Sequence, residues 1–299
     1  MRYIISFLLT STAALAEVPQ VVTDIPAVHS LTAAVMGDLG APVLLLDQGA
    51  SPHGFQLRPS QMHAIAGAGL VIWIGPELTP WLDKALATRP VDAATLGLLA
   101  ATPTHVQAFA AAHDHDHEDA GRGDEGLDPH AWLDPGNARA WVQLIARELA
   151  RQDPENTATY GANAATAVAA IDAAETQAQA LLAPVQDRPF VVFHDGYGYF
   201  TTHFGLPAAA AIAMGDAALP GARHLSDLRD TMAASGALCI FPEAQHDSAL
   251  VTQMAAASGL EVGPALDPAG SALPPGPGLY PELILGLAAG IASCPPQTP

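Results

Sequence analysis

The feature that most constrains the fold is the segment 155–182, which is rich in Ala, Gln, Glu and Leu and contains no strand pattern. These residues favour helix, and the single interruption, Gly161, costs about 1 kcal/mol relative to alanine, which the many alanines offset. A helix of this length spans ~40 Å at 1.5 Å per residue. Alternating strand and helix patterns flank the segment on both sides. We therefore expect two α/β lobes joined by one long, rigid helix over 154–184.

Short apolar runs that end in loops and precede helical patterns recur in both flanking regions. Continuous apolar strands are buried on both faces, as in parallel sheets, and their alternation with helices indicates α/β units. The sequence thus predicts mainly parallel sheets in an N-terminal lobe over 17–153 and a C-terminal lobe over 185–299. In such sheets ligands bind outside the carboxyl ends of the strands. The apolar runs are 21–24, 43–47, 70–75, 190–194, 238–243 and 260–267.

The first sixteen residues have the layout of a cleavable secretory signal. One positive charge, Arg2, precedes an apolar stretch that ends in Ala-Leu-Ala. The alternative is a membrane anchor, but the stretch is shorter than the ~20 apolar residues that a span requires. No cysteine stands near the expected cut, which argues against a lipoprotein anchor. We expect cleavage after Ala16 and a soluble exported protein.

The formal net charge of −19 limits the partners of the chain. A polyanion repels nucleic acid and anionic lipid, so neither is expected to bind. Cations are the natural attraction.

The chain has two cysteines, Cys239 and Cys294. Outside the cytoplasm an even number suggests a disulfide. Cys239 lies in an apolar strand run and Cys294 at the end of the last expected helix, so a bond would tie this helix to a central strand. The alternative is two buried free thiols.

Three of the twelve histidines stand out by their position. His53 lies in a loop after an apolar strand, His130 lies between two Asp-Pro turns, and His194 ends the run 190–194. Asp267 ends the run 260–267. Imidazole nitrogen is a strong zinc ligand and zinc favours four ligands in a tetrahedron, whereas manganese prefers more oxygen donors. These residues are candidate metal ligands, but spacing alone does not prove that they meet.

The remaining helical histidines are expected to be exposed or hydrogen-bonded, without a metal role. They are His29, His63, His203, His224 and His246.

A long loop over 103–128 contains the run His-Asp-His-Asp-His. In an extended chain side chains two apart face the same way, so His113, His115 and His117 could share one ion. The hypothesis is a secondary metal loop for weak capture and delivery to the main site, or for exchange with a metal carrier. The alternative is a solvated acidic loop.

Five segments, in this order, resemble the zinc-binding periplasmic proteins of bacterial ABC importers, within the family of metal-specific solute-binding proteins. They are Gly-Ala-Ser-Pro-His-Gly-Phe-Gln-Leu-Arg-Pro-Ser, Asp-Pro-His-Ala-Trp-Leu-Asp-Pro, Phe-His-Asp-Gly-Tyr-Gly-Tyr-Phe, Phe-Pro-Glu-Ala-Gln and Leu-Asp-Pro-Ala-Gly. The resemblance covers nearly the whole chain after the signal. It implies two α/β lobes, a long rigid helix between them and a metal site in the inter-lobe cleft.

The resemblance also implies the ligand set. His53 and His130 would come from the first lobe, and His194 and Asp267 from the second. Manganese binders of the family carry Glu where His194 stands, which favours zinc. Some zinc members have an acidic residue directly before the first ligand, where this chain has Pro52. Asp267, ahead of a water, is then the expected fourth ligand.

The function that the resemblance implies is capture of Zn²⁺ in the periplasm by a monomeric binding protein without enzymatic activity. The ion would pass to an inner-membrane ABC permease with its ATPase, and a periplasmic metal carrier is a further expected partner. Cys239 and Cys294 resemble the cysteine pair that forms a disulfide in zinc members.

Two rival functions stay open at this stage. The first is the same fold with manganese or iron as its ligand. The second is a zinc-dependent hydrolase, but the run 113–118 departs from the metallo-hydrolase pattern H-x-H-x-D-H, because His117 stands where Asp is required and Glu118 where His is required.

Overall fold

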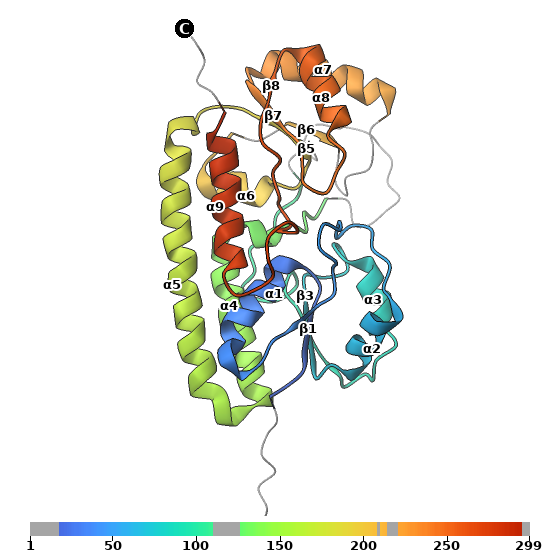
Figure 1. The fold of residues 1–299 in the computed structure, drawn as a ribbon, viewed down its shortest axis with the longest axis vertical. Helices are drawn as coiled ribbons and strands as arrows, with labels where there is room; N and C mark the ends of the chain where they lie inside the picture. The colour runs from blue at the N-terminus through green and yellow to red at the C-terminus, as the bar shows by residue number, and fades with distance from the viewer. Residues whose placement is uncertain (1–17, 110–125, 208–209, 214–220, 295–299) are drawn as a thin grey trace, which may run out of the picture.

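The computed structural model describes residues 18–109, 126–207, 210–213 and 221–294 (Figure 1). The expected signal, 1–16, and the three histidines of the run 113–117 lie outside the described residues. Among the helices described, none is long and apolar enough to cross a membrane.

The first sheet consists of four parallel strands in the order β2-β1-β3-β4. Their bounds are β1 (Val21–Thr23), β2 (Val43–Leu44), β3 (Leu70–Trp73) and β4 (Ala94–Gly97). The first three are followed by α1 (Pro26–Met36), α2 (Pro59–Gly67) and α3 (Pro80–Leu86). Each of these helices begins with proline, whose fixed φ suits the first helical position and whose missing N–H is not needed there. A short 3-10 turn, Gly37–Leu39, follows α1.

The second sheet is also parallel, in the order β6-β5-β7-β8. Its strands are β5 (Val191–His194), β6 (Ala210–Ala213), β7 (Cys239–Phe241) and β8 (Glu261–Val262). Its helices are α6 (Gly198–Phe204), α7 (Ala222–Ser235) and α8 (Ala249–Ser258). The predicted α/β architecture with two mainly parallel sheets is therefore confirmed.

The strand predictions were wrong in three places. β4 and β6 were missed because Ala-Thr-Leu-Gly and Ala-Ala-Ile-Ala contain few strong strand formers, and pairing with β3 and β5 determines their conformation instead. The expected strand 260–267 ends at Val262, and beyond it only a single bridge joins Leu266 to Glu243. Asp267 thus follows an isolated bridge and does not end a continuous strand.

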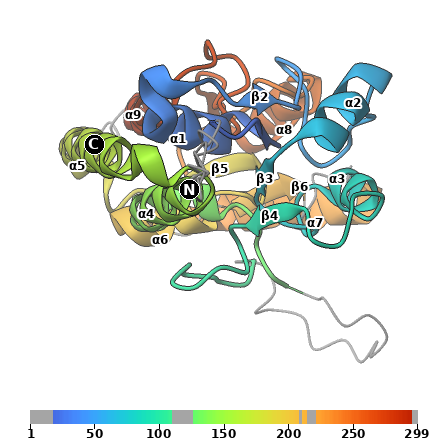
Figure 2. The same ribbon diagram turned by 90° about the horizontal axis from the view of Figure 1, so that it is seen from below.

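The long helix predicted over 154–184 is α5 (Thr157–Leu182), flanked by 3-10 turns at Pro154–Asn156 and Ala183–Val185. Figure 1 shows it running along one side of the molecule past both sheets. It packs against α4 (Pro135–Gln152) and α9 (Leu279–Ala292). Figure 2, seen from below, shows α1 and α4 beside α5.

The C-terminal helix α9 connects the two halves of the chain. It packs against α1 as well as α5, and one cluster of buried side chains runs from α1 through α4 and α5 to α6 and α9. At its end, Cys294 forms a disulfide with Cys239 of β7, as predicted, with the Cα atoms 5.9 Å apart. A shared core and this covalent bond favour little relative movement of the two sheets.

Candidate metal centre

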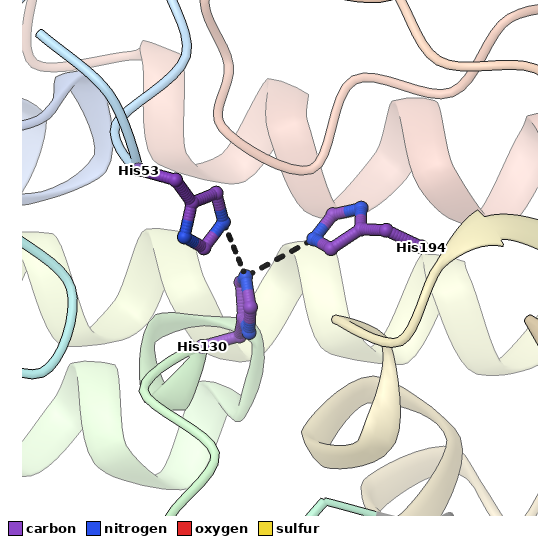
Figure 3. A group of neighbouring side chains, drawn as sticks. All are labelled: His53, His130 and His194. Atoms are coloured by element: carbon purple, nitrogen blue, oxygen red, sulfur yellow. Dashed lines mark hydrogen bonds between the residues drawn. The ribbon is translucent and has the colours of Figure 1, made fainter. Parts of the chain in front are cut away.

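Three imidazoles point toward one another (Figure 3). His53 lies in the loop after β2, His130 directly precedes the 3-10 turn Ala131–Leu133, and His194 is the last residue of β5. The Nε2 atom of His130 lies 3.2 Å from that of His53 and 3.1 Å from that of His194. Ligand atoms of all three lie within 4.8 Å of one another. The structure thus brings together the three histidines that the sequence singled out.

The loop that carries His53 is held by contacts on both of its flanks. The indole N–H of Trp81 in α3 donates to the carbonyl of Pro52 at 2.8 Å, and the Trp81 ring lies 5.2 Å from that of Phe55. Burial lowers the pKa of His53 to about 2, and the neighbouring imidazoles His130 and His194 add to the effect. His53 is therefore neutral and ready to donate its lone pair to a metal.

His130 is oriented by the carboxylate of Asp128. Oδ1 of Asp128 lies 2.7 Å from Nδ1 of His130 and also accepts its backbone N–H at 2.9 Å. Both side chains are 1% exposed, so the ring cannot turn freely in solvent. With Nδ1–H donating to Asp128, a neutral His130 carries its lone pair on Nε2.

His194 has an equivalent partner in Glu243, which follows β7. Oε1 of Glu243 lies 2.6 Å from Nδ1 of His194 and accepts the hydroxyl of Tyr197 at 3.2 Å. Burial works to lower the pKa of His194, but the charge and hydrogen bond of Glu243 outweigh it and raise the pKa. A carboxylate behind a histidine ligand fixes the tautomer and makes the ring a better donor.

These contacts leave two nitrogens facing each other. If both rings are neutral, the lone pairs of His130 and His194 point at one another across 3.1 Å. A positive charge between the rings, either a shared proton or a metal ion, removes the repulsion between these lone pairs. Two nitrogens bound to one tetrahedral zinc lie about 3.3 Å apart, given Zn–N distances of about 2.0–2.1 Å. The site therefore has the geometry of a cation-binding centre.

Asp267 lies outside this three-histidine group. Its Oδ1 accepts Nε2 of Gln245 at 2.6 Å and the backbone N–H of Ser271 at 3.0 Å, and its Oδ2 accepts the N–H of Ala272 at 2.8 Å. The two residues that follow it, Pro268 and Ala269, line the same small cavity as the three imidazoles. Asp267 thus borders the site without touching it.

Sequence reasoning missed three residues around the site. Asp128 and Glu243 stood inside quoted motifs without a role, although a carboxylate close to a candidate histidine ligand is a usable signal. His246 was expected to be an ordinary surface or hydrogen-bonded histidine. It lines the cavity with the three imidazoles, and its ring stacks on Phe193 at 4.4 Å.

Other histidines lie away from the centre. His63 is exposed on α2, and His29 is buried with Nε2 3.2 Å from the carbonyl of Pro42. His203 of α6 lies between two carboxylates, with Nδ1 2.8 Å from Asp134 and Nε2 2.6 Å from Glu175.

The family model of the periplasmic component A of the zinc-uptake complex, ZnuA, matches residues 21–294 of this chain. The chain belongs to this family. The ZnuA protein of the high-affinity zinc uptake system of Paracoccus denitrificans is 46% identical, over 93% of this chain and 92% of that protein. The corresponding protein of Brucella abortus is 34% identical, over 93% of this chain and 92% of its own.

Solved structures of the ZnuA family share the fold. A crystal structure of ZnuA superposes with a TM-score of 0.75 at 25% identity, covering 92% of this chain and 98% of that one. A ZnuA deletion mutant with zinc bound gives 0.76 at 26% identity, covering 94% and 99%. The binding protein FpvC of Pseudomonas aeruginosa, in complex with Mn²⁺, gives 0.79 at 23% identity, covering 92% and 97%, which supports the fold alone.

Proposed function

We propose that this chain is a periplasmic protein that captures Zn²⁺ with His53, His130 and His194 and delivers it to an ABC-type importer. The observation that supports this most is the convergence of three Nε2 atoms, two of which face each other at 3.1 Å with their opposite nitrogens held by buried carboxylates. The relatives from Paracoccus denitrificans and Brucella abortus are named as proteins of high-affinity zinc uptake systems.

Zinc is favoured over manganese by the chemistry of the donors. Three imidazoles suit zinc, whereas manganese prefers carboxylate, carbonyl and water oxygens. Asp267 supplies the fourth ligand, by turning from Gln245 and Ser271 toward the ion. Four protein ligands leave no open coordination position for a substrate, so the site acts as a carrier and not as a hydrolase.

The same proposal includes the path of the ion. The chain is exported, with cleavage after Ala16, works as a monomer, and passes zinc to an inner-membrane permease driven by its ATPase. The acidic surface raises the local concentration of cations. His113, His115 and His117 serve as a secondary loop that captures zinc weakly or exchanges it with a periplasmic carrier.

The experiment that tests this function is metal titration of the purified, metal-stripped protein. His194→Ala should weaken zinc binding at least 100-fold, and His63→Ala, on the exposed face of α2, should leave it unchanged. Equal losses in both variants would refute the assignment of the site. Competition between zinc and manganese at equal concentrations tests the choice of ion, and a preference for manganese would overturn it.

A further inference from the structure

His246, in the loop between β7 and α8, has no role in the site described so far. It follows the carboxyl end of β7, the strand that pairs with β5, so it lies next to the strand that ends in His194. It lines the cavity that contains His53, His130 and His194. It thus adds a fourth imidazole to the walls of one cavity.

His246 stands slightly apart from the three converging rings. The three converging rings have centroids 5.0–5.6 Å apart, whereas the His246 ring lies 6.4 Å from that of His194. The ring of His246 is thus 0.8–1.4 Å farther from that of His194 than the three converging rings are from one another. In its present position His246 is not part of the three-histidine group.

His246 is also more accessible than His130 and His194. Its side chain is 23% exposed, against 4% for His194 and 1% for His130. Zinc that reaches the buried nitrogens of His130 and His194 must therefore pass more exposed residues of the cavity wall, and His246 is one of these.

The Nε2 atom of His246 is not hydrogen-bonded to the neighbouring carboxylate of Glu243. The face of its ring is held by Phe193, but Nε2 lies 3.9 Å from Oε2 of Glu243, which is beyond hydrogen-bond distance. The neutral form of the ring is the form that binds a metal.

We propose that His246 is a transit ligand, which binds zinc on its way between solvent and the three-histidine site and speeds both loading and release. This inference rests on the proposed zinc function. A hydrated zinc ion must exchange its waters for imidazoles one at a time, and a neutral donor on the cavity wall lowers the barrier to that exchange. Because such a ligand lowers the same barrier from both sides, it changes the two rate constants together and leaves their ratio, the Kd, unchanged.

The test is rapid-mixing kinetics on the metal-stripped, full-length mature protein. Zinc uptake is followed by intrinsic tryptophan fluorescence and zinc release by transfer to a chromogenic chelator. His246→Phe keeps an aromatic ring on Phe193 and removes both nitrogens. We expect it to slow loading and release about fivefold or more each, with the Kd within threefold of wild type. His63→Phe, on the exposed face of α2, is the matched control and should change neither rate.

Three outcomes overturn the proposal. Wild-type rates in His246→Phe would show that the donor nitrogens are not used. A Kd raised tenfold or more would make His246 a resident ligand of the loaded site. If zinc loading and release are slow in His246→Ala but have wild-type rates in His246→Phe, the role of His246 is to pack against Phe193. In each case tight zinc binding by the wild type preserves the proposed function, and failure of the wild type to bind zinc would refute that function separately.

Discussion

The Nε2 atoms of His130 and His194 lie 3.1 Å apart, although the two residues come from different halves of the chain. Each ring is fixed from behind by one buried carboxylate, Asp128 or Glu243. The pair is thus oriented before any ion arrives, and little conformational entropy is lost when a metal binds.

The carboxylate behind His194 should be essential for affinity. Glu243→Gln keeps the shape of the side chain but removes the charge that makes His194 a strong donor. We expect a 10–100-fold loss of zinc affinity, the range found for residues that orient metal ligands. Competitive titration with a zinc chelator measures this. Glu77→Gln, an exposed residue beyond β3, is the control, and an equal loss there would contradict a specific role of Glu243.

Zinc loading should release protons. Without metal the raised pKa of His194 keeps a proton between its ring and that of His130, and zinc must displace it. Affinity should therefore rise with pH until the pH passes the raised pKa of His194, which lies above the ordinary histidine value of about 6.5. Calorimetry in buffers of different ionisation enthalpy counts the protons. A proton count of zero at pH 6 would contradict the shared-proton arrangement.

The substitution Asp267→Asn tests whether the Asp267 carboxylate is the fourth zinc ligand. If Asp267 leaves Gln245 and Ser271 to bind zinc, loss of its charge should lower the affinity about tenfold. X-ray absorption of the zinc-loaded protein should then show three imidazoles and one oxygen in the wild type. An unchanged affinity in Asp267→Asn would assign the fourth position to water.

His203 should stabilise the protein in a defined pH window. The hydrogen bond that His203 donates to Asp134 raises the pKa of His203, burial opposes this, and Glu175 adds to the rise. The pKa values of Asp134 and Glu175 are lowered, because hydrogen bonds to His203 and other donors outweigh the effect of burial. The His203 contribution is complete below its unfolded pKa of about 6.5 and is lost as the pH rises through the raised folded value. The carboxylate contributions are lost as the pH falls below about 4.5.

Urea unfolding of the metal-free protein measures this contribution. His203→Gln should lower the free energy of unfolding by about 2 kcal/mol at pH 6, as for hydrogen bonds to charged groups, and by less at pH 9. His63→Gln serves as the control. A pH-independent difference between His203→Gln and wild type would show that charge is not involved.

Loss of the disulfide should lower the stability of the fold but leave the zinc affinity of the folded protein unchanged. Cys239 and Cys294 are 55 residues apart, and closing a loop of this length stabilises by about 4 kcal/mol in the chain-entropy model. Cys239→Ser with Cys294→Ser should therefore lower the midpoint of urea unfolding. At urea concentrations where the variant is still folded, its zinc affinity should equal that of the wild type, because neither cysteine borders the cavity. A large loss of affinity in the folded variant would contradict this separation.

The amino-acid sequence by itself determined the elements whose signals are local. The helix over Thr157–Leu182 follows from its composition, the parallel strands β1, β3, β5 and β7 follow from continuous apolar runs, and the three candidate histidines follow from their places after strands or between turns. The disulfide was expected from the cysteine count, and its pairing is found in the structure.

Only the tertiary structure decided which side chains meet. β4 and β6 form because neighbouring strands pair with them, and the partnership of Glu243 with His194 joins residues 49 positions apart. The place of Asp267 beside Gln245, and of His246 inside the cavity, likewise depends on how separate loops are positioned over the sheets. Periodicity and propensity act within a few residues, whereas distances between loops are set by the packing of the whole core, which no local pattern encodes.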